Sequence, residues 1–234
     1  MNATRTLDAE TILTATETVL RRYGPEKATV RDVARALGVS HASVYRHFPS
    51  KAALREAVTR RWISRAHADL NALATNTALP PPERLRAWLT TLFTCKRNMT
   101  SQDPELFATY RILVDEHTTV ATDHVAVLIE QLRGIITEGV DNGDFHTADP
   151  TATAQVVFNA TMAYHHPAHA PQWHTPEAET ALQSVCTLLI AGLSAQPVGS
   201  AHHQDQAGSS SQSVSDHSAD ALLNHRKAPR TRCT

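Results

Sequence analysis

Cysteine and glycine are scarce in this chain of 234 residues, and no long apolar run is present. The 3 cysteines are widely spaced and odd in number, which argues against a disulfide framework and fits a reducing compartment. The longest apolar stretch, near Cys186–Leu193, is much too short to span a membrane. The first ten residues lack the apolar core of a signal peptide. We therefore expect a cytoplasmic protein that makes no contact with a membrane.

Patterns typical of catalysis are also missing. With only 8 glycines, mostly at predicted helix ends, a glycine-rich turn that binds nucleotide phosphates is not expected. The chain shows no Ser-His-Asp spacing and no helix with paired catalytic carboxylates. We therefore predict that the protein is not an enzyme, and no cofactor is indicated.

Histidine, in contrast, is abundant, with 14 residues. One cluster lies beside Pro167 and Pro171 and consists of His165, His166, His169 and His174. Together with His124 it offers imidazole ligands for zinc or nickel, but no carboxylate or cysteine stands at helical ligand spacing within it. We predict no metal site, and keep as an alternative a metal- or redox-responsive switch that uses these histidines or Cys95.

The two ends of the chain differ in charge, although the formal net charge is only −1. Residues 1–70 hold 12 Lys and Arg against 7 Asp and Glu, a surplus of +5. Residues 71–195 hold 6 against 13, a deficit of −7. Because basic segments attract phosphate and acidic ones are repelled by it, the N-terminal end is expected to face nucleic acid.

Residues 29–51 predict two short helices joined by a tight glycine turn. Thr29 can cap the first helix by accepting a hydrogen bond from the backbone N–H of Asp32. The apolar face of this helix consists of Val30, Val33, Ala34 and Leu37. Gly38 suits the left-handed position that ends a helix, and Ser40 can cap the second helix.

The second helix has an apolar face and a polar face. Val39, Val44 and Phe48 are predicted to point inward and to fix it against the first helix. The outward side chains are His41, Ala42, Ser43, Arg46 and His47, with Tyr45 at the edge and Lys51 just beyond. Arginine, histidine and serine can contact base edges or phosphates, and alanine is small enough to approach a thymine methyl. This is the pattern of a helix that lies in the major groove of DNA.

These motifs resemble the DNA-binding domain of the TetR family of repressors over roughly residues 8–60. The matching segments are 28–34, 37–40 and 44–54, without insertion between Thr29 and the Tyr-x-His-Phe-x-x-Lys segment. The resemblance implies a DNA-binding transcriptional regulator, most simply a repressor, with an activator role left open. It implies DNA contacts by Thr29, Arg31, Ser40, His41, Ala42, Ser43, Tyr45, Arg46, His47 and Lys51. Since His41 and Arg46 occupy variable positions of the family, they are expected to set the operator sequence.

Only helices are predicted in the rest of the chain, about nine in total, so the protein is expected to be all-α. We expect a three-helix, helix-turn-helix domain over residues 1–50 and a connecting helix over 51–75. After Pro80-Pro81-Pro82, a helical bundle for effector binding and dimerisation is expected over 83–195. Its helix Asp149–Tyr164 is apolar nearly all round, which is typical of a central helix. The polar composition of residues 196–234 predicts a disordered tail.

A homodimer is expected because one recognition helix covers too few base pairs for useful selectivity. Two such helices about one helical turn, roughly 34–36 Å, apart would bind a near-palindromic double-stranded operator. The resemblance places the dimer interface on the last two helices, residues 149–164 and 176–193.

A small-molecule effector is expected to bind inside the helices from residue 83 to residue 164. The candidate lining residues are Trp88, Leu92, Phe107, Tyr110, Leu128, Phe158, Met162 and His165. This mostly apolar set suggests a hydrophobic or aromatic ligand with a few polar groups. A DNA-binding protein that responds to no ligand is the remaining alternative.

Overall fold

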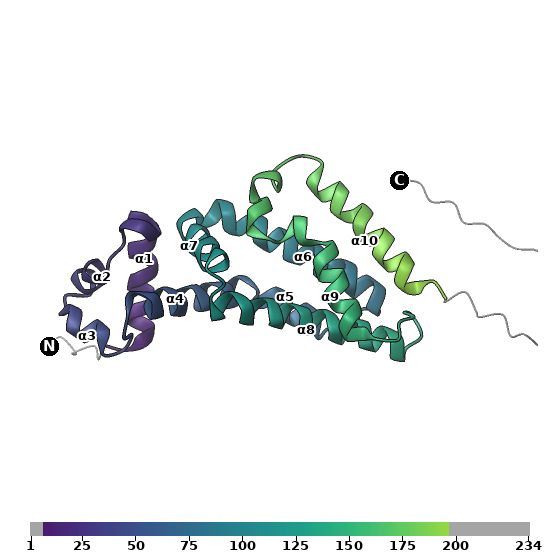
Figure 1. The fold of residues 1–234 in the computed structure, drawn as a ribbon, viewed down its shortest axis with the longest axis horizontal. Coiled ribbons are helices and arrows are strands. Elements are labelled where there is room, and N and C mark those ends of the chain that lie inside the picture. The colour runs from purple at the N-terminus through teal and green to yellow at the C-terminus, as the bar shows by residue number, and fades with distance from the viewer. Residues whose placement is uncertain (1–6, 197–234) are drawn as a thin grey trace, which may run out of the picture. The chain divides into compact units, whose positions relative to one another are not determined.

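The computed structural model describes residues 7–196, which form ten α-helices, two 3-10 helices and no strand (Figure 1). In chain order they are α1 (Ala9–Lys27), α2 (Val30–Leu37), α3 (His41–Tyr45), α4 (Lys51–Ala66), α5 (Ala68–Ala74), α6 (Pro81–Gln102), α7 (Pro104–Asp115), α8 (Thr119–Asp141), α9 (Pro150–Ala160), η1 (Met162–Tyr164), η2 (Pro167–Gln172) and α10 (Ala178–Ser194). The all-α prediction is confirmed. In this range no helix combines the length and the apolar character that crossing a bilayer requires. The tail predicted to be disordered lies outside the described residues, apart from Gln196.

Helices α1, α2 and α3 pack together in the N-terminal part (Figure 1). Asp8 begins α1 by accepting a hydrogen bond from the backbone N–H of Thr11 at 2.7 Å. Glycine followed by proline usually ends a helix, but here Gly24, with a positive φ of 74°, only kinks α1, and the helix continues to Lys27. The shared core of the three helices contains Ile12, Val19, Leu20, Val30, Val33 and Val44.

The connecting helix expected over residues 51–75 is interrupted at His67. Here φ is −105° and ψ is 16°, and the residue ends α4 and precedes α5. No proline or glycine marks this break. The imidazole of His67 is 3% exposed and stacks on that of His124 in α8, with centroids 4.8 Å apart and planes 7° apart. Since the partner lies far away in the sequence, local patterns could not reveal the interruption.

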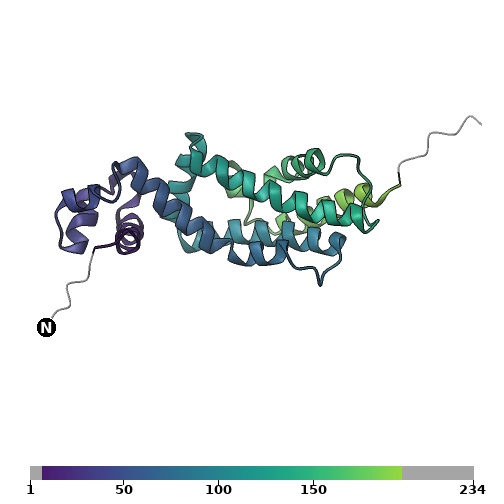
Figure 2. The same cartoon turned by 90° about the horizontal axis from the view of Figure 1, so that it is seen from below.

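Helices α6 to α10 form the body that follows. Helix α8 packs on α6 and α9, α10 packs on α6, and α4 and α5 run beside α8 (Figure 2). The core of this body includes Leu85, Trp88, Leu92, Phe93, Leu132, Ile135 and Ile136. Helix α7 contacts α1 and α4 as well as α8, so it joins the body to the N-terminal helices.

Helix α9 ends earlier than predicted, at Ala160 instead of Tyr164. The carbonyl of Phe158 accepts hydrogen bonds from the Thr161 hydroxyl at 3.1 Å and from His165 Nε2 at 3.0 Å. A 3-10 turn, η1, replaces the last part of the expected helix. Helix α9 is also not central in the single subunit, because Val156 is 62% exposed.

Candidate DNA-binding surface and effector cavity

Reciprocal hydrogen bonds between Thr29 and Asp32 close the start of α2. The Thr29 hydroxyl accepts from the Asp32 N–H at 3.2 Å, and the Asp32 carboxylate accepts from the Thr29 N–H at 3.1 Å. The carboxylate also accepts the Thr29 hydroxyl proton at 2.6 Å, and these bonds, with Arg35, lower the pKa of Asp32. The hydroxyl of Thr29 is therefore engaged in capping. To donate to a phosphate, the Thr29 hydroxyl must first break its hydrogen bond to the Asp32 carboxylate.

The turn between α2 and α3 has the predicted form. Gly38 adopts the left-handed conformation, with φ 68° and ψ 28°. Its N–H donates to the Arg35 carbonyl at 3.2 Å, and the Val39 N–H donates to the Ala34 carbonyl at 3.0 Å. The carbonyls of Ala34 and Arg35, near the end of α2, are thus satisfied. A residue with a Cβ is strained at this φ, which explains why glycine occupies the turn.

Helix α3 presents an exposed polar face. Val44 is fully buried, and Val39 and Phe48 are half-buried against the core, as predicted for the inward face. Among the predicted DNA contacts Ser43 is half-buried, whereas the exposed residues are Thr29, Arg31, Ser40, His41, Ala42, Tyr45, Arg46, His47 and Lys51. The structure thus brings the predicted set together around α3 and the starts of α2 and α4.

Hydrogen bonds within α3 orient this face. Ser40 Oγ accepts from the backbone N–H of Ser43 at 3.2 Å, and the two hydroxyl oxygens lie 2.9 Å apart. Arg46 Nη2 donates to Ser43 Oγ at 3.3 Å. The rings of His41 and Tyr45 meet edge to face, with centroids 6.2 Å apart. The surface therefore offers exposed donors on a short, capped helix, which suits the edges of bases.

The body contains a cavity of about 500 Å³ between α7, α8 and the segment that follows α9. Its lining consists of Lys96, Tyr110, Val114, Asp115, His117, Ala121, Thr122, His124, Val125, Leu128, Phe158, Met162, His165, His166 and Pro167. The volume lies within the range of small-molecule sites, roughly 300–1,000 Å³. Asp115, His117, Thr122 and Met162 are exposed and mark the mouth.

The cavity contains some of the predicted effector residues but not all. Tyr110, Leu128, Phe158, Met162 and His165 line it. Trp88, Leu92 and Phe107 are instead buried in packing outside the lining.

Sequence reasoning missed Lys96, which is 1% exposed and lines the cavity. The signal was present in α6, because Lys96 continues the buried line of Trp88 and Leu92 at intervals of four residues. A lysine on an apolar helix face is unusual and indicates a specific polar environment. Burial lowers the pKa of this amine to about 7.

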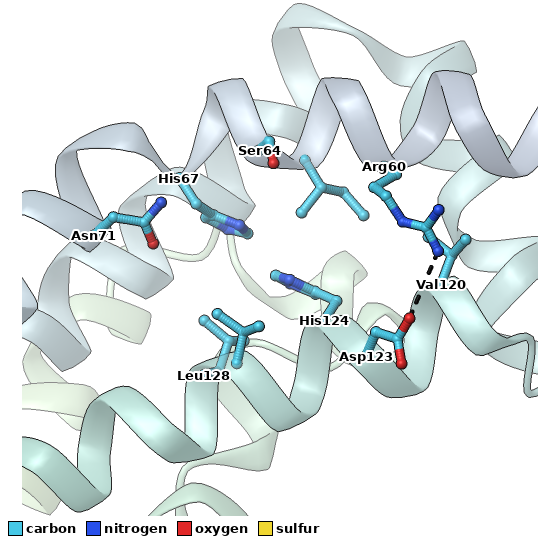
Figure 3. A pocket seen from close by; sticks show the side chains of 10 residues that line it. Arg60, Ser64, His67, Asn71, Val120, Asp123, His124 and Leu128 are labelled. Atoms are coloured by element: carbon cyan, nitrogen blue, oxygen red, sulfur yellow. Dashed lines mark ion pairs between the residues drawn. The ribbon is translucent and has the colours of Figure 1, made fainter.

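A smaller cavity of about 240 Å³ lies between α4, α5 and α8 (Figure 3). His67 and His124 line it together, and Arg60 pairs with Asp123 across it at 3.5 Å. His124 also lines the larger cavity, so one ring stands between the two spaces. Burial, and then the charge of Lys96, lowers the pKa of both imidazoles well below the usual value, so both are neutral at pH 7.

Ion pairs connect the segments around the larger cavity with α1 and α4. Arg55 of α4 pairs with Glu116, directly after α7, at 2.5 Å. Arg60 of α4 pairs with Asp123 of α8. Arg21 of α1 pairs with Asp103, the residue that precedes α7, at 2.6 Å. Helix α4 is thus ion-paired with α8 and with the residue after α7, and α1 with the residue before α7.

The histidine cluster does not assemble into a chelating group. Across residues 7–196, no three side chains of His, Cys, Asp or Glu are arranged to hold a metal ion. His165 is instead buried and bonds to the Phe158 carbonyl. Burial raises the pKa of the Cys95 thiol, which disfavours the reactive thiolate. The metal- and redox-responsive alternatives gain no support from this geometry.

Two family models match the chain. Residues 12–58 match "Bacterial regulatory proteins, tetR family", and residues 81–186 match "Tetracyclin repressor-like, C-terminal domain". No curated protein matches the sequence. A helix-turn-helix unit joined to an all-helical body defines a DNA-binding transcriptional regulator. The chain belongs to the TetR family.

Solved structures share this fold at low sequence identity. FadR from Bacillus subtilis, in complex with stearoyl-CoA, is 16% identical over 80% of this chain and 100% of its own, with a TM-score of 0.58. FadR from Bacillus halodurans is 20% identical over 80% and 100%, with a TM-score of 0.57. A TetR transcription regulator from Haloarcula marismortui is 18% identical over 79% and 96%, with a TM-score of 0.59. At this level of identity, the likeness concerns the fold alone.

Proposed function

We propose that this protein is a homodimeric repressor that binds a near-palindromic operator and releases it when a small molecule occupies the larger cavity. One relationship carries the proposal: α7 and α8 line the cavity, and α8 and the two residues that flank α7 are ion-paired with α1 or α4. Helix α4 follows α3 in the chain and is ion-paired with the segments around the cavity, so it connects the proposed DNA-binding and ligand-binding regions.

The DNA-binding part of the proposal rests on the exposed face of α3. Arg46 and His47 are proposed to contact base edges, and Tyr45 and Lys51 to contact phosphates. Their side chains are all exposed, and the basic surplus of residues 1–70 favours a polyanion.

Release of DNA requires the effector to bind more tightly to the DNA-incompetent state than to the competent one, since equal affinity shifts no population. The contacts of α7 and α8 with the N-terminal helices supply a structural basis for such a difference. The FadR of Bacillus subtilis, which shares the fold, holds stearoyl-CoA in its solved structure. This precedent supports ligand binding by the present chain without specifying the ligand.

The dimer is proposed to form through α9 and α10. Val156 of α9 and Leu188 of α10 are 62% and 74% exposed in the single subunit. Small exposed residues on the same helices permit close approach of a second copy: Ala152, Ala160, Ala181, Ala191 and Gly192. Burial of such apolar side chains between two copies stabilises a four-helix interface.

The proposal is tested by selecting DNA fragments with the purified full-length protein and sequencing those retained. The expected result is an enriched sequence with two related half-sites, protected by a species that light scattering shows to be a dimer. A stable single subunit with no preference over random competitor DNA contradicts the proposal.

One substitution tests the dimer interface independently of the folding of the subunit. Leu188→Arg is expected to yield folded monomers and to weaken operator binding, because a charge cannot be buried unpaired between two copies. Val127→Arg is the control, since Val127 is also half-exposed, at 52%, but belongs to α8. The control should remain dimeric.

A further inference from the structure

Lys96 is the least exposed polar side chain lining the larger cavity, and no carboxylate compensates its charge. Its Nζ lies 3.2 Å from the Tyr110 hydroxyl and 3.1 Å from His124 Nε2. The ammonium also lies 4.5 Å from the centroid of the Tyr110 ring. No ion pair found among residues 7–196 includes Lys96, and no carboxylate there raises its pKa; Cys95 is the one side chain whose charge does so. When it is protonated, this amine is therefore a cation buried among neutral partners.

The neutrality of these partners follows from their own burial. Burial raises the pKa of Tyr110, which keeps the phenol protonated. His124 is neutral, and its Nε2 accepts from the ammonium. Burial also lowers the pKa of His165 to about 4, and its Nε2 donates to the Phe158 carbonyl. A buried charge without a counter-ion is costly, so the empty cavity lacks an anion that would stabilise the Lys96 ammonium.

The remaining lining is suited to an apolar molecule. Val125, Leu128 and Phe158 line the cavity, and the exposed residues Asp115 and His117 mark its mouth. A ligand that fills this space thus meets apolar side chains along its length and a single buried cation. A neutral apolar end placed against Lys96 would leave the ammonium without a counter-ion.

We propose that the effector is an organic acid whose carboxylate enters first and pairs with Lys96, while its apolar body packs on Leu128 and Phe158. The proton of the Tyr110 hydroxyl has no acceptor among the described residues and can be donated to the same carboxylate. This inference rests on the proposed effector role of the cavity and specifies the chemical class of the ligand.

Proton uptake is a consequence of this arrangement. Several titratable groups face Lys96. Its charge acts on His67 between α4 and α5, His124 of α8, His165 and His166 before η2, and Cys95 of α6. Tyr110 of α7 accepts a hydrogen bond from it. Lys96 has a pKa of about 7 in the empty cavity, and a bound carboxylate raises this pKa. The affinity for the acid should therefore fall about tenfold per pH unit as the pH rises above 7.

The test compares acids with neutral amides of the same shape. Octanoate and octanamide form one pair, and 3-phenylpropanoate and 3-phenylpropanamide form the other. Titration calorimetry with the full-length protein at pH 7 should show one of the two acids binding at least about thirtyfold more tightly than its amide. Equal binding of acid and amide, or no binding by either acid, overturns the proposal.

Substitutions identify the side chains that contribute to acid binding. Lys96→Met, which keeps the length of the side chain, should weaken acid binding at least about thirtyfold and leave amide binding unchanged. Tyr110→Phe should weaken acid binding about tenfold. Lys27→Met is the control, because Lys27 is exposed at the end of α1, and it should bind the acid like the unmodified protein. Full acid affinity in Lys96→Met contradicts the assignment.

This experiment is independent of the proposed regulation, since it measures ligand binding by the free protein. Acids that bind through Lys96 but leave the operator complex intact would support the site and contradict effector release. Release of the operator by the amides, with no tighter binding of the acids, would support effector control and overturn the inferred ligand class.

Discussion

Arg21 of α1 and Asp103 at the start of α7 form a two-point ion pair. Arg21 Nε donates to Asp103 Oδ1 at 2.6 Å, and Nη2 donates to Oδ2 at 3.2 Å. The indole N–H of Trp62 in α4 donates to the same carboxylate at 3.1 Å. The Asp103 side chain thus joins α1, α4 and the start of α7, a helix that lines the larger cavity. These bonds, led by that from Arg21, lower the pKa of Asp103.

We predict that Asp103→Ala lowers the free energy of unfolding by about 1–3 kcal/mol, because it leaves the buried Trp62 N–H without an acceptor. It should also reduce the effect of the ligand on DNA binding, since α1 and α7 lose a direct connection. Urea unfolding measures the first effect, and operator titrations with and without ligand measure the second.

The control for this prediction is Arg22→Met. Arg22 neighbours Arg21 and is exposed, and its guanidinium lies over the ring of Tyr23 instead of contacting α7. Arg22→Met should change neither the free energy of unfolding nor the coupling, that is, the effect of the ligand on DNA binding. An Asp103→Ala protein with unaltered coupling would show that α1 and α7 do not transmit the signal through this pair.

Two substitutions on the proposed DNA-binding face should affect DNA binding in different ways. Lys51→Ala is expected to weaken binding to all sequences alike and to reduce the slope of log K against log salt by about 1, because a phosphate contact is lost. Arg46→Ala should relax discrimination at one or two base positions, by roughly 1–3 kcal/mol if the contact is bidentate. Each variant removes one positive charge, so each controls for the other. A changed sequence preference in Lys51→Ala, with the slope intact, contradicts its assigned role.

The N-terminal domain could be predicted residue by residue because its signals are local. The caps of Thr29 and Ser40 involve residues three positions away, and Gly38 satisfies a backbone requirement of its own turn. Such signals are present in any window of a few residues. Helices were likewise expected over residues 149–164 and 176–193, where the structure has α9 and α10.

The features that were missed depend on residues far apart in the sequence. The break at His67 accompanies stacking on His124, and the polar end of the cavity forms only when Lys96, Tyr110 and His124 meet from three helices. Trp88 and Leu92 have the same residue types as a ligand pocket, but they pack into the core. Composition alone does not distinguish an apolar wall from an apolar interior.

Two glycines provide a test of the predicted turn with opposite expected signs. Gly38→Ala should destabilise the protein by roughly 1 kcal/mol, because φ is positive although no atom lies within 4 Å of the added Cβ. Gly134→Ala, at an exposed position inside α8 with equally open space, should stabilise it by roughly 0.5–1 kcal/mol. Thermal or urea unfolding of the two variants measures both changes. A stabilising Gly38→Ala would contradict the role given to the left-handed turn.

The buried amine of Lys96 makes stability depend on pH in a direction that can be measured. Its pKa is about 7 in the folded protein and near its ordinary value of 10.5 in the unfolded chain. Between these values the unfolded chain binds the proton that the folded protein has lost, so stability rises with pH by up to ~1.4 kcal/mol per unit from this group. Lys96→Met removes this pH-dependent contribution to the free energy of unfolding. We expect the variant to be more stable than the unmodified protein at pH 7, with a difference that narrows toward pH 10.

Urea unfolding at pH 7, 8.5 and 10 measures this difference without any ligand. Lys27→Met is again the matched control, because it removes the same charge from an exposed position and should show no comparable narrowing. A difference between Lys96→Met and the unmodified protein that stays constant over this range would mean that Lys96 does not release its proton near neutrality. The ammonium would then hold its charge in the empty cavity, and the affinity for an acid would no longer fall as the pH rises above 7.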